Sequence, residues 1–255
     1  EPLWKNFNSL FHAIDVGNDE LSIDAYNGGL FAPDAVADDL IIPDPLATDL
    51  ADLAKWDYRS EVPVTVLGHI FEQSITDLEK LRAKKVGQTE PKVSKRKREG
   101  VVYTPDVVTR FLVERTVGLT LSEKFDALLA KHSQASKLKD ESSINWRLGD
   151  ASEVAFWRDY VDALRNLTVL DPACGSGAFL VAAFDVLARE YRRAVDRLID
   201  LDAPVDFDVF DEIITKNLYG VDLNAESVEI TRLALWLKTA RRQHRLQNLE
   251  ATIKV

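Results

Sequence analysis

The residues best suited to chemistry lie in one short stretch, VLDPACGSGAFL at 169–180. Asp171 ends an apolar run, and Gly175, Ser176 and Gly177 follow before the next apolar run begins. Glycine adopts backbone angles that other residues resist and lets a ligand approach the main chain closely. The unpaired N–H groups at the start of a helix after this turn would favour an anion. We therefore expect the turn to bind a carboxylate or a phosphate, and a purely structural strand–helix turn is the alternative.

The spacing of the glycines separates this turn from two common nucleotide-binding motifs. A phosphate-binding P-loop requires Gly-Lys-Ser/Thr, and no Lys follows Gly177. The dinucleotide fingerprint has a third glycine near position 180, which is Leu180 in this chain. The sequence therefore disfavours a P-loop nucleotide and NAD as the ligand.

A second acid lies in NLYGVDLNAESVEITRLALWL, residues 217–237. Asp222 ends another predicted strand, where its carboxylate is placed to accept two hydrogen bonds from a ribose diol, worth roughly 1.5–3 kcal/mol each. Leu223 beside it could pack on an adenine face. An acidic helix cap is the alternative for Asp222 alone. Together the two segments fit a ligand with a carboxylate at one end and adenosine at the other, and S-adenosylmethionine is such a molecule.

The elements that position these acids alternate between strands and helices. The hydrophobic pattern predicts, in order, helix 151–165, strand 167–171, helix 177–198, a short loop and helix, strand 218–222, helix 225–243 and a strand near 252–255. Such alternation is typical of a parallel, doubly wound α/β sheet, whose ligands bind outside the carboxyl ends of the strands. We expect the neighbouring strand tips at Asp171 and Asp222 to hold opposite ends of one ligand.

The region before this alternation has a helical pattern. Apolar residues at spacings of three and four predict helices near 3–14, 44–56 and 64–82. An Asn-Gly-Gly turn is expected within AYNGGLFAP, residues 25–33. We expect a helical N-terminal region over 1–90 and a second domain over 91–255.

Two polar stretches, 84–100 and 131–150, are predicted as loops. Between them VVYTPDVVTRFLVERTV passes from an extended segment into a helix. Thr104 is expected to cap this helix, with Pro105 as its first residue, because the fixed φ of proline suits that position.

The composition limits the class of protein. A chain of 255 residues is near the upper limit for one hydrophobic core, so one large domain or two smaller ones are expected. No apolar run approaches the roughly 20 residues of a membrane-spanning helix, and no signal peptide is visible. The single cysteine, Cys174, excludes an internal disulfide and a Cys-based zinc site and indicates a reducing, cytoplasmic setting. Because the chain begins at Glu1 and contains no Met, we expect it to be a fragment.

Three motifs together resemble one family of enzymes. DPACGSG resembles motif I, and GVDLN motif II, of the S-adenosylmethionine-dependent DNA methyltransferases that modify adenine at N6. REGVVYTP followed by a helix resembles motif X, which precedes motif I in the gamma order of these enzymes. AYNGGLF and VLGHIFEQSI are similar to the helical region that precedes motif X in type IIG restriction–modification proteins and BREX-type (PglX-like) methyltransferases. The resemblance implies a partial Rossmann-like methyltransferase sheet, containing the first strands only, after a helical region.

The resemblance also implies roles for individual residues. The methionine part of the cofactor would be lined by Asp171, Ala173, Cys174, Gly175, Ser176 and Gly177. Its amino-acid end would be covered by Tyr103, Thr104 and Pro105, while Asp222 would hold the ribose beside Leu223 at the adenine. Cys174 would be a small turn residue and not a nucleophile, since the motifs around it offer no His base.

The catalytic motif of this family, Asn/Asp-Pro-Pro-Tyr/Phe, is absent, because the sequence contains no Pro-Pro. In such a site a flipped adenine stacks on the aromatic ring while its N6 amine donates to the Asn or Asp side chain. We expect the parent protein to methylate adenine in double-stranded DNA, and residues 1–255 alone to be inactive. The alternatives are a methyltransferase acting on protein, RNA or a small molecule, and a non-catalytic DNA-binding or assembly module with this fold.

A basic run just before motif X is a candidate DNA-binding segment. Its side chains are Lys92, Lys95, Arg96, Lys97 and Arg98, and a solvated loop is the alternative. We predict the effect of replacing Lys95, Arg96, Lys97 and Arg98 by neutral residues in the full-length protein. The slope of log affinity for DNA against log salt concentration should become less steep by about 0.9 for each phosphate contact that is lost. An unchanged slope in a binding titration against salt would reject a role in DNA binding.

Overall fold

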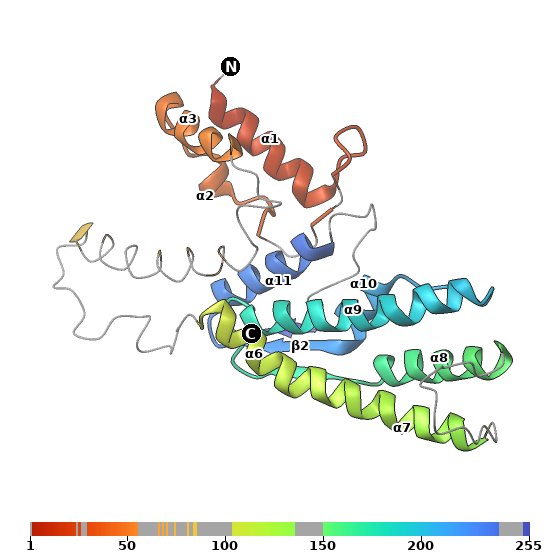
Figure 1. The fold of residues 1–255 in the computed structure, drawn as a ribbon. Coiled ribbons are helices and arrows are strands. Elements are labelled where there is room, and N and C mark those ends of the chain that lie inside the picture. Colours follow the sequence, from red (N-terminus) through yellow and green to blue (C-terminus); the bar gives the residue numbers. More distant parts are fainter. Residues whose placement is uncertain are drawn as a thin grey trace. The chain divides into compact units, whose positions relative to one another are not determined.

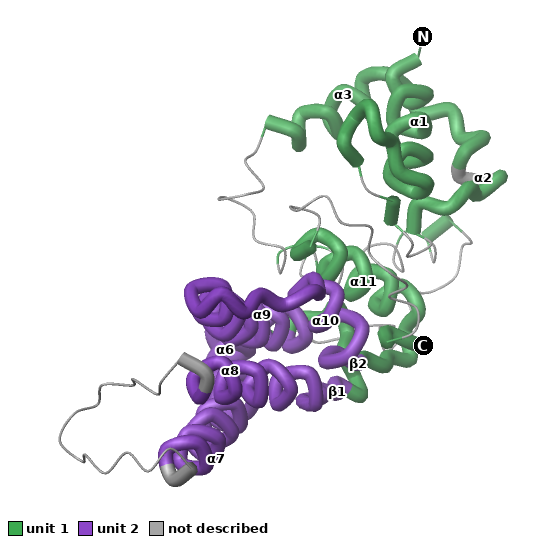
Figure 2. The backbone as a smooth tube through the Cα atoms, turned by 90° about the vertical axis from the view of Figure 1, so that its right-hand side faces the viewer, with its two compact units in different colours: residues 1–104, 172–178, 220–255 green, residues 105–171, 179–219 purple. Residues whose placement is uncertain are grey.

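The computed structural model describes residues 2–23, 25–26, 30–55, 104–135, 150–239 and 252–255, together with the single residues 66, 68, 70, 74, 81, 84 and 85. The chain divides into two compact units (Figure 2). Unit 1 contains residues 1–104, 172–178 and 220–255, and unit 2 contains 105–171 and 179–219. Each unit therefore combines segments that are far apart in the sequence. The division into 1–90 and 91–255 stays a prediction.

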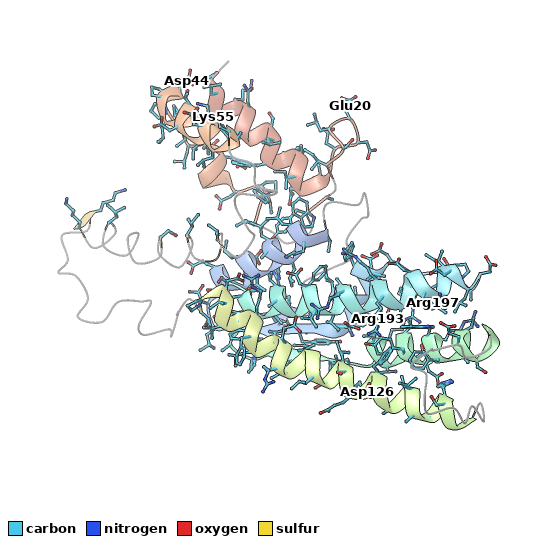
Figure 3. The ribbon with its side chains drawn as sticks, viewed as in Figure 1. Glu20, Asp44, Lys55, Asp126, Arg193 and Arg197 are labelled. Atoms are coloured by element: carbon cyan, nitrogen blue, oxygen red, sulfur yellow. The ribbon has the colours of Figure 1, made fainter. Side chains whose placement is uncertain are left out.

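Unit 1 begins with short helices joined by polar contacts. They are α1 (Leu3–Val16), α2 (Ala35–Asp38), α3 (Asp44–Asp52) and a 3₁₀ turn over Leu53–Lys55. The backbone N–H of Leu3 donates to Asp44 Oδ1 at 3.0 Å, and Asn8 Nδ2 donates to the carbonyl of Asp38 at 3.2 Å (Asp44 is labelled in Figure 3). The helices predicted near 3–14 and 44–56 are confirmed. Those residues of the predicted helix 64–82 that the structure describes are helical.

A chain of aromatic rings connects α1 to α11 (Ala225–Thr239) within unit 1. Neighbouring ring centroids lie 5.4–6.2 Å apart along the series Trp4, Phe7, Phe11, Phe31, Tyr26 and Trp236. Tyr26 is fully buried, and its hydroxyl donates to the carbonyl of Glu229 at 3.4 Å. Burial, followed by the charge of Glu229, raises the pKa of Tyr26 above its ordinary range. Tyr26 thus anchors the N-terminal helices on α11.

Unit 2 is built mainly of helices. They are α6 (Asp106–Val113), a π-helical turn (Glu114–Gly118), α7 (Leu119–Ala135), α8 (Asp150–Arg165), α9 (Ala178–Asp200), α10 (Val209–Glu212) and a second π-helical turn (Ile213–Asn217). The three long helices α7, α8 and α9 lie alongside one another (Figures 1 and 2). The aromatic ring of Phe125 on α7 packs edge-on against Phe156 and Tyr160 of α8, at centroid distances of 5.2 and 5.0 Å. The Arg193 guanidinium on α9 lies 4.2 Å from the centre of the Phe125 ring. Arg193 is labelled in Figure 3. This cluster joins the three helices.

Two sequence expectations in unit 2 are wrong. Thr104 does not cap α6: Pro105 holds the cap position with an extended ψ of 138°, and the helix begins at Asp106, whose carboxylate pairs with Arg110. Residues 131–135 of the predicted loop 131–150 are helical, since α7 continues to Ala135, and residues 136–149 lie outside the described part of the chain. His132 Nε2 lies 3.0 Å from Asp159 Oδ2 of α8, and this contact is the main cause that lowers the pKa of Asp159. The polar character of residues 131–135 predicted that α7 would end before them. Contacts with α8 stabilise the helix over these residues instead.

Three strands in the described part of the chain form one small sheet. They are β1 (Val169–Asp171), β2 (Leu218–Val221) and β3 (Ile253–Lys254), in the order β1–β2–β3. β2 and β3 run parallel, with Gly220 opposite Ile253. The predicted alternation of strands and helices is confirmed from residue 150 to residue 239. None of the helices within the described ranges combines the length and apolar character needed to cross a membrane.

Asn217, directly before β2, is a fully buried polar residue of unit 2. Its Nδ2 donates to the carbonyls of Leu164 at 2.8 Å and Leu167 at 2.6 Å, and its Oδ1 accepts from the Tyr191 hydroxyl at 3.2 Å. The side chain therefore joins the end of α8, the connection to β1, and α9. These contacts fix the position from which β2 starts.

We predict that Asn217→Leu lowers the free energy of unfolding by about 2–3 kcal/mol, because the buried Tyr191 hydroxyl loses its acceptor and the Leu164 and Leu167 carbonyls each lose a donor. Urea denaturation followed by circular dichroism measures the loss. Asn166→Leu is the matched control, since Asn166 is exposed and bonds only within its own turn, to the carbonyl of Asp162. Equal effects of the two substitutions would contradict the prediction.

Candidate functional site

The glycine turn over residues 172–177 connects β1 to α9. Gly175 and Gly177 have φ angles of +52° and +84°, in the left-handed region that favours glycine. The N–H of Gly177 donates to the carbonyl of Cys174 at 2.8 Å and closes the turn. α9 begins at the next residue, Ala178. The predicted tight strand–turn–helix connection is therefore present.

Asp222, directly after β2, is hydrogen-bonded to this turn. Its Oδ2 accepts the backbone N–H of Gly175 at 2.9 Å, across 47 positions of sequence. Its Oδ1 accepts the N–H of Asn224 at 2.8 Å, and the N–H of Cys174 donates to the carbonyl of Val221 at 3.0 Å. Each carboxylate oxygen accepts about two hydrogen bonds, so the half-buried Asp222 keeps acceptor capacity for a ligand. One carboxylate thus connects the two segments in which the sequence predicted chemistry.

α11 packs against the other side of the turn. Thr231 Oγ1 donates to the carbonyl of Gly175 at 2.8 Å. A Cβ on Gly177 would lie only 2.8 Å from Thr231 Cγ2. The start of α11 is held by Asn224, which is buried and whose Oδ1 accepts the N–H of Ser227 at 2.8 Å. The turn is therefore bonded both to the end of β2 and to α11.

Asn224 and Thr231 were not among the residues predicted for the site. Asn224 carries a signal that could have identified it, since asparagine before an apolar helical run is a preferred helix cap. Thr231 carries no such signal. Its importance arises only from the way α11 packs on the turn.

The other residues predicted in the turn and after β2 differ in exposure. Cys174, Ser176 and Gly177 are buried, whereas Ala173 is exposed. Leu223 is 90% exposed. An apolar side chain so open to solvent is suited to contact a flat apolar group, as the resemblance implies.

The residues expected at the two ends of the cofactor do not all fall in one unit. Asp171 is half-buried at the end of β1 and belongs to unit 2, as does the exposed Pro105. The half-buried Thr104 belongs to unit 1. Tyr103 and the basic residues Lys95, Arg96, Lys97 and Arg98 lie outside the described residues.

The arginines of α9 have partners within unit 2. Arg189 Nη1 lies 3.0 Å from Glu114 Oε1, and Arg197 Nε lies 2.6 Å from Glu153 Oε1. Figure 3 labels Arg193 and Arg197 on α9. These side chains stabilise contacts among the helices of unit 2.

Comparisons with known proteins show which family the chain resembles. Residues 150–254 match the family described as MmeI, DNA-methyltransferase domain. The chain is 30% identical over 186 residues to a Methanocaldococcus jannaschii protein named as a putative type II restriction enzyme and methyltransferase, and 25% identical over 154 residues to the adenine-specific methyltransferase PglX of Lacticaseibacillus casei. The predicted resemblance to adenine-specific DNA methyltransferases is confirmed.

The matched parts of these relatives are small. The first alignment covers 69% of this chain and 14% of the relative, and the second covers 58% and 12%. The type IIL restriction–modification enzyme MmeI, solved in complex with DNA, superposes with a TM-score of 0.51 over 94% of this chain and 28% of MmeI, at 21% identity. This structural likeness supports the fold of the chain, with its small parallel sheet among helices.

We predict that Gly177→Ala destabilises the protein more than Gly175→Ala does. Both place a side chain at positive φ, at a cost of about 1–2 kcal/mol, but a Cβ at Gly175 has open space whereas one at Gly177 overlaps Thr231. The overlap should add about 1–3 kcal/mol. Chemical denaturation measures both effects, and Gly177→Ala should cost less in a Thr231→Ala background. Equal destabilisation at the two glycines would show that Thr231 does not constrain the turn.

Proposed function

We propose that this chain is the S-adenosylmethionine-binding part of an N6-adenine DNA methyltransferase, with a Rossmann-like sheet, from a restriction–modification or phage-defence system. The observation that carries the proposal is the bond between the Gly175 N–H and Asp222, since it joins the glycine turn to the acid that we propose to hold the ribose. The relative named PglX is adenine-specific, and MmeI was solved with DNA. Double-stranded DNA is therefore the proposed partner of the parent protein, and the cytoplasm its proposed location.

The residues in unit 1 fit the cofactor in three respects. The space where a Cβ of Gly175 would stand is open to 4 Å, so a ligand can approach the main chain there. Asp222 has acceptor capacity for two ribose hydroxyls beyond the two N–H groups that it already binds. Leu223 presents an exposed apolar side chain next to this carboxylate, where an adenine ring would lie.

When bound, S-adenosylmethionine supplies a methyl group activated by a sulfonium. The chain's own residues orient it. The turn over 172–177 would line the methionine part together with Asp171. Its amino-acid end would be covered by Tyr103, Thr104 and Pro105. The sequence contains no Pro-Pro, hence no Asn/Asp-Pro-Pro-aromatic motif to receive adenine. We therefore propose that residues 1–255 bind the cofactor without transferring its methyl group.

The experiment is calorimetric titration of the chain with S-adenosylmethionine. Asp222→Ala should weaken binding by about 2–3 kcal/mol if the ribose is held through hydrogen bonds to a charged group. Asp206→Ala, at an exposed acid outside the site, is the control and should leave affinity unchanged. Circular dichroism of each variant excludes unfolding as the cause.

The outcomes separate the alternatives. Absence of any cofactor affinity in the wild-type chain would favour a non-catalytic binding or assembly module. An Asp222→Ala affinity equal to wild type would remove Asp222 from the ribose site. Methyl transfer to DNA by residues 1–255 alone would contradict the proposed lack of activity. If the parent protein methylates RNA, protein or a small molecule and does not methylate DNA, the alternative of a methyltransferase for another substrate class would be favoured.

A further inference from the structure

We infer that Gly68 is a positioning residue for the cofactor-binding turn, because its lack of a side chain lets an N-terminal helical segment pack directly on Ser176. Val66, Gly68 and Ile70 are helical, and Gly68 is buried. Gly68 and the turn both belong to unit 1. The role of the turn rests on the proposed function, whereas the contact itself rests on geometry.

The contact leaves no space for a methyl group. A Cβ added at Gly68 would lie 2.7 Å from Ser176 Cβ and would also overlap Ser176 Oγ. Carbon atoms attract best at about 3.5–4.0 Å, so this approach is strongly repulsive. Rotation of the serine side chain moves Oγ but not Cβ, whose position is fixed by the main chain. Any side chain at Gly68 must therefore displace the helical segment or the turn.

The turn itself has little freedom to move away. Thr231 of α11 lies against Gly177 of the turn. A Cβ added at Gly177 would lie 2.8 Å from Thr231 Cγ2. The Gly175 N–H is held by Asp222 at 2.9 Å. A shift of Ser176 away from Gly68 would disturb these neighbouring contacts and the turn that is proposed to line the methionine part of the cofactor. A displacement of about 1 Å is enough to weaken the contacts between a binding site and its ligand strongly.

Gly118 provides a matched comparison. A Cβ at Gly118 would meet Glu114 Oε2 at 2.8 Å, which is the end of a flexible, half-exposed side chain. That side chain can rotate away, with loss of its ion pair with Arg189 at most, so the backbone need not move. Gly118 lies in unit 2, outside the proposed site.

The test is titration of S-adenosylmethionine into wild type, Gly68→Ala and Gly118→Ala. We expect Gly68→Ala to weaken affinity about tenfold or more, which is ~1.4 kcal/mol, and Gly118→Ala to leave it unchanged. Affinity of Gly68→Ala equal to wild type would overturn the inference. If wild type itself does not bind, the proposed function fails, and the contact is then decided by the rescue experiment.

The rescue variant is Gly68→Ala/Ser176→Gly, which removes both overlapping serine atoms. Gly68→Ala should lower the midpoint of urea unfolding and the cofactor affinity in the wild-type background. When Gly68→Ala is added to Ser176→Gly, both losses should be much smaller. Recovery of folding would also support the contact if Gly68→Ala alone unfolds. A double variant as impaired as the sum of the two single variants would show that Gly68 does not act through Ser176.

Discussion

The geometry of the candidate site depends on one carboxylate. Asp222 accepts the N–H of Gly175 with one oxygen and the N–H of Asn224 with the other. Hydrogen bonds to an ionised acceptor are roughly twice as strong as neutral ones. The left-handed φ of Gly175 gives the turn its shape, and Asp222 then connects that turn to the end of β2. Without this carboxylate, the N–H groups of Gly175 and Asn224 would lose the acceptor that they share.

Close packing of small residues supports the same turn. Ser176 lies against Gly68, Gly177 lies against Thr231, and Thr231 Oγ1 also donates to the carbonyl of Gly175. These contacts restrict the turn before any ligand arrives, and a restricted site loses less conformational freedom on binding. The N-terminal helical segment is thus part of the surroundings of the site, although it precedes the glycine turn by a long stretch of sequence.

Much of the fold and the centre of the site follow from local sequence. Apolar periodicity predicted β1, β2, α9 and α11, and the glycines identified the tight turn. The failures arise from contacts between distant segments. The helix α7 extends to Ala135 because His132 and Lys131 contact Asp159 of α8. Sequence predicted Asp222 as a ribose acceptor but not its bond to Gly175, which requires both segments to be folded. Gly68 and Thr231 resemble any other glycine and threonine in a helix until the turn is packed between them.

The central claim is that the turn bonded by Asp222 is where the nucleoside cofactor binds. Amide NMR of the isotope-labelled chain during titration with S-adenosylmethionine tests it most directly. The account predicts saturable shifts of the Gly175 and Asn224 amide signals, because both N–H groups donate to the carboxylate that would receive the ribose. The amide of Asn217, which lies before β2, should stay unchanged. Saturable shifts confined to other parts of the chain, or no shifts at all, would contradict the account.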